Sequence, residues 1–325
     1  DGCARLTGLI PHKAIVRADG SADDAARSGI GGDSVTELKH NTVRLNGIDI
    51  HYVEAGQGPL ILFVHGFPDF WRVWIDQLKH FSKSHRVVAL DMRGFNLTSK
   101  PKEPEAYRAK ILVEDVRQLI LHLGERRCIL VAHDWGGAAI WNFAAQHPDM
   151  VEKLIIMNSP HTMTFVRELV NNPDQQKASA YMNFFRRPEA EQAMTEDNFR
   201  RLFSMFGRGN LRTLDDEEKQ AYVDAWSTPD GVAGGLNYYR ATPMYPPLPN
   251  DPGPAALTLD PAQFRVPAPT LVLWGMADTA LLPGLLTGLG EHVPNLKVVE
   301  MPGVSHWPMR EKPDEVNRLI GAFIG

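Results

Sequence analysis

The chain has 325 residues, of which 43% are hydrophobic and 22% charged, and its formal net charge is −5. A chain of this length and composition can bury a large core and form one catalytic domain, with or without an inserted lid. The small negative charge and the lack of a long basic cluster argue against nucleic acid, so we expect a small-molecule substrate. The longest apolar run, residues 59–64, is far shorter than the roughly 20 residues of a membrane helix, so no membrane span is expected.

Residues 1–34 are rich in Gly, Ala, Ser and Asp without a sustained period, which predicts an N-terminal extension outside the catalytic domain. The chain begins at Asp1 rather than methionine, so a soluble cytoplasmic protein and one exported after signal cleavage both stay open, as does assembly into a homodimer. Only two cysteines are present, Cys3 and Cys128, and a disulfide framework is not expected. We expect Cys128, inside a predicted core strand, to be inert.

Next along the chain, strand-like and helix-like segments alternate. The sequence predicts strands at residues 36–45, 48–54, 59–65, 86–91, 127–133, 153–158, 270–274 and 296–299. Continuous apolar runs in 59–65 and 127–133 are typical of parallel strands covered on both faces, whereas the first two strands alternate and favour antiparallel pairing. Helical spacing over 109–123 and 313–324 indicates packing helices. The expected fold is therefore α/β, with a mostly parallel eight-stranded sheet and helices on both faces.

Residues 161–254 have a different character, because they are helical in pattern, rich in aromatic residues and Arg, and carry no strong strand. The Pro- and Gly-rich residues 243–254 are typical of an exit linker. We therefore predict an inserted helical cap at 161–254, with the core formed by 35–160 and 255–325.

Asp134 occupies the centre of the run Ala132-His133-Asp134-Trp135-Gly136 between a predicted strand and a predicted helix. This small-x-nucleophile-x-Gly spacing is the nucleophile elbow of α/β-hydrolases, where a tight turn presents the central side chain to the site. A carboxylate that attacks an ester would give an anhydride, but at an sp³ carbon it displaces a leaving group and forms a hydrolysable ester. Asp134 therefore indicates attack on an epoxide or a carbon–halogen bond.

Two later turns supply the partners that such a nucleophile needs. Asp278 and His306 each follow an apolar strand, in the chain order nucleophile, acid, histidine, so we expect Asp278 to orient the imidazole of His306. The turn after the strand ending at residue 64 places the backbone N–H of Phe67 where it can form an oxyanion hole with that of Trp135.

Four motifs together resemble the α/β-hydrolase-fold epoxide hydrolases over about residues 36–325. They are His65-Gly66-Phe67-Pro68, Asp91-Met92-Arg93-Gly94-Phe95, His133-Asp134-Trp135-Gly136-Gly137 and Gly303-Val304-Ser305-His306-Trp307. The resemblance implies two cap tyrosines that grip the epoxide oxygen, and the matching segments assign them to Tyr181 and Tyr239, with Tyr238 as a packing neighbour. A phenol of pKa about 10 stays protonated at neutral pH and can donate. Further substrate contacts are expected from His65, Pro68, Trp135, His161 and Trp307.

The expected reaction converts an epoxide and water into a vicinal diol through a hydroxyalkyl ester on Asp134, without a metal or organic cofactor. Haloalkane and haloacid dehalogenases use the same nucleophile and stay open as alternatives. Trp135 can bind a halide, although the haloacetate enzymes place Arg at that position. A non-catalytic ligand-binding protein is a further alternative, but such proteins commonly lose a member of the triad, and this chain keeps all three.

Overall fold

Eight strands form one sheet in the order β1-β2-β4-β3-β5-β6-β7-β8 in a computed structural model that describes residues 37–207 and 214–325. The strands are β1 (Lys39–Leu45), β2 (Ile48–Ala55), β3 (Leu60–Val64), β4 (Arg86–Leu90), β5 (Cys128–His133), β6 (Val151–Met157), β7 (Thr270–Gly275) and β8 (Leu296–Met301). β2 pairs antiparallel with β1 and β4, and every other neighbouring pair is parallel. The predicted mostly parallel sheet, with its antiparallel first strands, is confirmed. The predicted extension, 1–34, lies outside the described residues.

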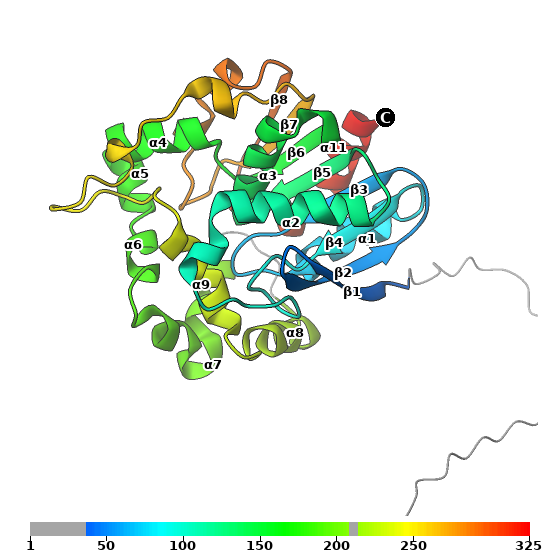
Figure 1. The fold of residues 1–325 in the computed structure, drawn as a ribbon, viewed down its shortest axis with the longest axis horizontal. Coiled ribbons are helices and arrows are strands. Elements are labelled where there is room, and N and C mark those ends of the chain that lie inside the picture. The colour runs from blue at the N-terminus through cyan, green and yellow to red at the C-terminus, as the bar shows by residue number, and fades with distance from the viewer. Residues whose placement is uncertain (1–36, 208–213) are drawn as a thin grey trace, which may run out of the picture. The chain divides into compact units, whose positions relative to one another are not determined.

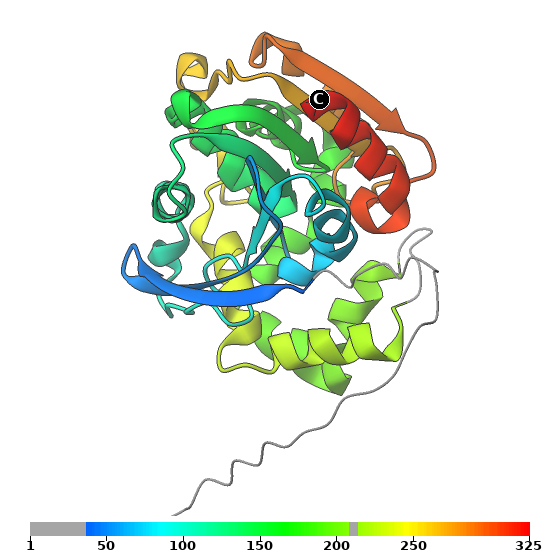
Figure 2. The ribbon, with the colours of Figure 1, turned by 90° about the vertical axis from the view of Figure 1, so that its right-hand side faces the viewer.

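Helices cover both faces of the sheet, as Figures 1 and 2 show. α2 (Ala109–His122) and α3 (Asp134–Gln146) pack together on one face, and α1 (Ile75–Phe81) and α11 (Pro313–Ile324) on the other, with the short α10 (Pro308–Glu311) beside them. Strands β3 and β5 are therefore buried along their whole length. Their continuously apolar sequence is the consequence of this double covering.

The segment between β6 and β7, which we call the cap, is helical. It comprises α4 (Thr162–Asn171), α5 (Pro173–Ala178), α6 (Tyr181–Phe185), α7 (Ala190–Phe206), α8 (Asp216–Trp226) and α9 (Gly231–Ala241). In both ribbon views α6 to α9 lie together at one side of the sheet (Figures 1 and 2). The described residues belong to one compact unit, so the predicted domain boundaries at 160 and 254 stay predictions. None of the helices in the described part of the chain is long and apolar enough to cross a bilayer.

The parallel strands bring distant parts of the sequence to one edge of the sheet. Phe67 follows β3, Asp134 follows β5, Asn158 follows β6, Asp278 follows β7 and His306 follows β8. Ligands of open α/β sheets bind in the crevice outside the carboxyl ends of the strands. The candidate site is therefore built from the loops at this edge.

Candidate active site

A tight turn presents Asp134 at the junction of β5 and α3. Its backbone φ is +49°, a left-handed conformation that costs a non-glycine residue about 1–3 kcal/mol and is concentrated at functional sites. The turn also needs Gly136, because a Cβ there would lie 2.4 Å from the carbonyl oxygen of Val64 in β3. The predicted strand, turn and helix around Asp134 are thus present.

The two oxygens of the Asp134 carboxylate have different surroundings. Oδ1 accepts a hydrogen bond from the backbone N–H of Phe67 at 2.8 Å, and Oδ2 lies 3.5 Å from Nε2 of His306. A Cβ on Gly66 would lie 2.3 Å from Oδ1, so only glycine leaves room for the carboxylate there. An amide thus holds one oxygen and leaves the other directed at the histidine. The predicted contribution of the Trp135 amide stays a prediction.

Asp278 orients His306 through a short hydrogen bond. Nδ1 of His306 donates to Oδ2 of Asp278 at 2.6 Å, while Oδ1 of Asp278 accepts the N–H groups of Ala280 and Leu281 at 2.8 and 3.0 Å. Burial alone would raise the pKa of the Asp278 carboxyl, but the charge of His306 and these hydrogen bonds bring it below its ordinary value. Asp278 is therefore a charged and fixed partner for the imidazole.

The charges around His306 set its protonation state. Burial lowers the pKa of this imidazole, but the carboxylates of Asp278 and Asp134 outweigh burial and raise it to about 10. Burial likewise raises the pKa of Asp134, and the hydrogen bond and charge of His306 bring it below the ordinary carboxyl value. At neutral pH His306 is therefore an imidazolium between the carboxylates of Asp134 and Asp278.

Two residues that the sequence analysis did not assign to the site, Asn158 and His133, hold Asp278 and His306 in place. The side-chain N–H of Asn158 donates to Oδ2 of Asp278 at 2.8 Å, and its Oδ1 accepts the N–H of Gly275 at 2.8 Å. His133 donates from Nε2 to the backbone carbonyl of His306 at 2.8 Å, and burial lowers the pKa of His133 to about 3, so its ring is neutral. The available signals were the position of Asn158 at a strand end and of His133 directly before the nucleophile.

The two predicted cap tyrosines line the same small cavity as Asp134, the predicted nucleophile. Tyr181 at the start of α6 and Tyr239 in α9 have ring centroids 6.0 Å apart, and both line a small cavity with Asp134. Burial raises the pKa of both phenols above the ordinary value, so both remain protonated donors. The hydroxyl of Tyr238 instead donates to the carbonyl of Arg93 at 2.8 Å, and its predicted packing role stays a prediction.

Two histidines predicted to bind substrate have other partners. His65 donates from Nδ1 to the carbonyl of Gly66, and its Nε2 accepts the N–H of Met92. His161 donates from Nε2 to the carbonyl of Phe264 and caps α4 through Nδ1. With both nitrogens of each ring engaged, these side chains shape backbone turns, and neither lines the cavity beside Asp134. The predicted substrate contacts of both residues stay predictions.

Pro68 and Trp307 lie close to the site but also have structural contacts. The peptide bond before Pro68 is cis, and the Pro68 carbonyl accepts the indole N–H of Trp226 at 2.8 Å. The ring of Trp307 packs edge-on against His306 with centroids 4.7 Å apart and lines a second cavity with it. Contact with substrate stays a prediction for both.

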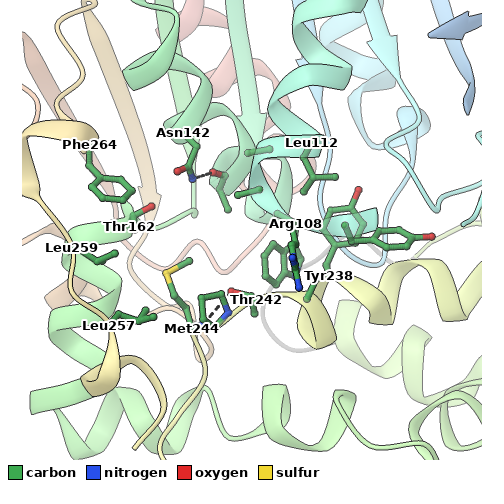
Figure 3. Close-up of a pocket in the computed structure, with 17 residues that line it drawn as sticks. Arg108, Leu112, Asn142, Thr162, Tyr238, Thr242, Met244, Leu257, Leu259 and Phe264 are labelled. Carbon is green, nitrogen blue, oxygen red and sulfur yellow. Dashed lines mark hydrogen bonds between the residues drawn. The ribbon is translucent and has the colours of Figure 1, made fainter. Parts of the chain in front are cut away.

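An apolar chamber adjoins the cavity at Asp134. It has a volume of about 490 Å³, and Trp135, Ala138, Thr162 and Met244 line both spaces. Figure 3 shows its side chains, with Met244, Leu257, Leu259 and Phe264 toward one side and Leu112 and Tyr238 toward the other. Because its walls are mostly aliphatic and aromatic, the chamber suits an apolar group rather than a charged one.

Comparison with known proteins identifies similar chains over most of the sequence. A family model described as alpha/beta hydrolase fold matches residues 59–313. The chain is 35% identical over 297 residues to epoxide hydrolase 4 of Mus musculus, covering 88% of this chain and 79% of that protein. It is 39% identical to a solved Bacillus megaterium epoxide hydrolase in complex with an inhibitor, with a TM-score of 0.80 and coverage of 87% and 99%. The Vigna radiata epoxide hydrolase VrEH1 is 27% identical with a TM-score of 0.72, covering 89% of this chain and 98% of that one.

Proposed function

Because the chain belongs to the epoxide hydrolases of the α/β-hydrolase fold, we propose that it opens its epoxide through a covalent ester on Asp134. The observation that carries this proposal is the arrangement of the Asp134 carboxylate, with Oδ1 on the Phe67 amide and Oδ2 directed toward His306. The similarity to epoxide hydrolases favours this activity over the dehalogenase and the non-catalytic alternatives. The tyrosine pair supports the same choice, because an alkoxide leaving group needs a proton and a halide does not.

In the first step, the hydroxyls of Tyr181 and Tyr239 hold the epoxide oxygen while Oδ2 of Asp134 attacks a ring carbon from the opposite face. The new carbon–oxygen bond forms as the ring bond breaks, and the electron pair of the broken bond goes to the ring oxygen. A tyrosine protonates that oxygen and regains its proton, through solvent, from the His306 imidazolium. The step leaves a neutral ester and a neutral imidazole. His306 therefore becomes a base only after the ester has formed, in time for the second step.

In the second step, His306 removes a proton from water, which attacks the carbonyl carbon of the ester. The negative charge develops on Oδ1, which already accepts the Phe67 N–H, and a preorganised donor stabilises such an oxyanion. Collapse breaks the acyl–oxygen bond, and the diol alkoxide takes the proton back from the imidazolium. This cleavage regenerates Asp134 as a carboxylic acid, which gives its proton to His306 and so restores the resting ion pair.

An isotope experiment tests this route. In a single turnover in H₂¹⁸O with enzyme in excess, water attacks the ester carbonyl, so ¹⁸O is expected in the Asp134 peptide and the diol stays unlabelled. Direct attack of water on the epoxide would give a labelled diol and an unlabelled peptide, and would contradict the covalent route. The peptide that contains Asp278 is the internal control, since its carboxylate never forms an ester.

The apolar chamber supports a proposal about the substrate. A variant of the Bacillus megaterium relative was solved with its product, (R)-3-[1]naphthyloxy-propane-1,2-diol, a diol with a large apolar substituent. In this chain the chamber of about 490 Å³ shares Trp135 and Met244 with the cavity at Asp134, and such a volume is within the usual range of small-molecule sites. We propose that the substrate is an epoxide with an extended apolar substituent, which occupies the chamber.

A series of terminal epoxides of increasing alkyl length tests the substrate proposal. Burial of each methylene contributes about 0.8 kcal/mol, so kcat/KM is expected to rise about fourfold per added carbon until the chamber is filled. Leu259→Trp should remove this dependence and spare the shortest epoxide. Leu248→Trp, at an exposed leucine of the cap's exit segment, is the matched control. An unchanged length dependence in Leu259→Trp would contradict the proposed occupancy.

A further inference from the structure

Asp69 is a buried carboxylate for which the proposed mechanism has no use. Its residue is 1% exposed, and it lies just past the turn that contains Phe67. Oδ1 accepts the hydroxyl of Tyr222 at 2.6 Å and Oδ2 accepts the indole N–H of Trp307 at 2.8 Å. A buried carboxylate is costly unless it is hydrogen-bonded, and here each oxygen has a donor from a different part of the chain.

Asp69 connects the two loops that serve the second step, the loop of Phe67 and the loop of His306. Asp69 is two residues after Phe67, whose amide holds Oδ1 of the nucleophile, and Trp307 directly follows His306. The Asp69 N–H also closes the turn by donating to the carbonyl of Gly66 at 3.0 Å. A single carboxylate therefore links the loop that carries the oxyanion donor to the loop that carries the base.

The same network reaches the cap through α8. Tyr222 lies on α8, and Arg310 of the core donates to its hydroxyl and to Glu218 of the same helix, both at 3.1 Å. Trp226, also on α8, donates to the carbonyl of Pro68. Burial raises the pKa of Asp69, and the charge of Arg310 and the hydrogen bonds from Tyr222 and Trp307 oppose that rise. Helix α8 is thus joined twice to the turn that carries the Phe67 amide, through Pro68 and Asp69.

We propose that Asp69 is a positioning residue that sets the Phe67 amide and His306 at the correct separation for ester hydrolysis, and that α8 of the cap supports it. This inference rests on the proposed two-step mechanism. The first step depends on Asp134 and the tyrosines, whereas in the second the amide and the imidazole must act on one carbonyl group. A misplacement of about 1 Å between such groups can cost about 10²-fold in rate.

Asp69→Asn tests the proposal with almost no change in size. An amide has one acceptor oxygen and an NH₂ donor, so it cannot accept from both Tyr222 and Trp307. With its oxygen on the Trp307 indole, its NH₂ faces Tyr222, and the hydroxyl proton of Tyr222 loses its acceptor. The rate of ester hydrolysis is expected to fall by about 10- to 100-fold, while the rate of alkylation changes less than about threefold. Because hydrolysis then limits turnover, kcat and KM should fall together with kcat/KM nearly constant, and the ester on Asp134 should accumulate in the steady state.

Matched variants separate positioning from general damage. Tyr222→Phe removes the donor from the cap, together with one acceptor of Arg310, which keeps its contact with Glu218. It should give the same pattern at smaller amplitude, which keeps the test valid if Asp69→Asn does not fold. Asp149→Asn, the same change at an exposed aspartate, should leave both steps unchanged. Equal losses in kcat and kcat/KM without ester accumulation would overturn the positioning role, as would unchanged kinetics. If His306→Gln traps an ester and Asp69→Asn does not, this inference fails alone; if neither does, the two-step mechanism itself fails.

Discussion

Replacement of Asp134 by Asn should lower the pKa of His306 and so reveal how the site orders its two steps. In the resting enzyme that pKa is about 10, with the Asp134 carboxylate 3.5 Å from Nε2. Two unit charges at this distance attract by about 4–5 kcal/mol at an effective dielectric constant of about 20. At about 1.4 kcal/mol for each pKa unit, loss of the Asp134 charge should bring His306 down by about 3, to near 7. Asn, like the ester, is neutral and similar in shape, so the variant reports the imidazole of the intermediate.

The assay is an NMR titration of the His306 ring in the wild type and in Asp134→Asn, assigned through His306→Gln. Intact mass confirms that the introduced amide persists, and Asp174→Asn at an exposed position is the control for loss of one negative charge. The sign is definite, because removal of an anion stabilises the neutral imidazole. A pKa that stays near 10 in Asp134→Asn would refute the reasoning that alkylation of Asp134 releases the base.

Three other outcomes are expected. Tyr181→Phe and Tyr239→Phe should each slow the alkylation step by about 10²-fold in single-turnover kinetics, with hydrolysis of the ester unchanged, and a slower hydrolysis step would contradict their role. Gly136→Ala should lower the free energy of unfolding by about 1–3 kcal/mol in urea denaturation, because the new Cβ would lie 2.4 Å from a carbonyl oxygen of β3; an unchanged midpoint would count against the close approach. Cys128 is buried and burial raises its pKa, so a Cys3→Ser variant should react with a thiol reagent only after unfolding, and rapid labelling of the folded protein would exclude a buried thiol.

The parts of the site that sequence predicts are those encoded by local pattern and chain order. The apolar runs of β3 and β5 predict parallel strands because both faces of a parallel sheet are covered. Asp134 is recognisable because the turn after β5 needs small residues two positions before and after the nucleophile. Asp278 and His306 are recognisable because each follows a strand, in a fixed chain order. The structure brings these three side chains together at the edge where the strands end.

Contacts between distant segments account for what the sequence did not reveal. Asp69 looks like an ordinary turn residue until the fold places Tyr222 and Trp307, 153 and 238 positions away, on its two oxygens. Asn158 gains its function only beside Asp278. For His161, no local pattern in the sequence signals that its ring bonds to the carbonyl of Phe264, 103 positions away.

The central claim is that Asp134 forms a covalent ester with the substrate. The most direct measurement is the intact mass of the His306→Gln enzyme after exposure to an aryl or alkyl epoxide, followed by peptide mapping. We expect an increase equal to the whole mass of the epoxide, located on Asp134 and absent from the Asp134→Ala, His306→Gln double variant. Diol formation at the wild-type rate without any adduct, or an adduct at another residue, would contradict the mechanism.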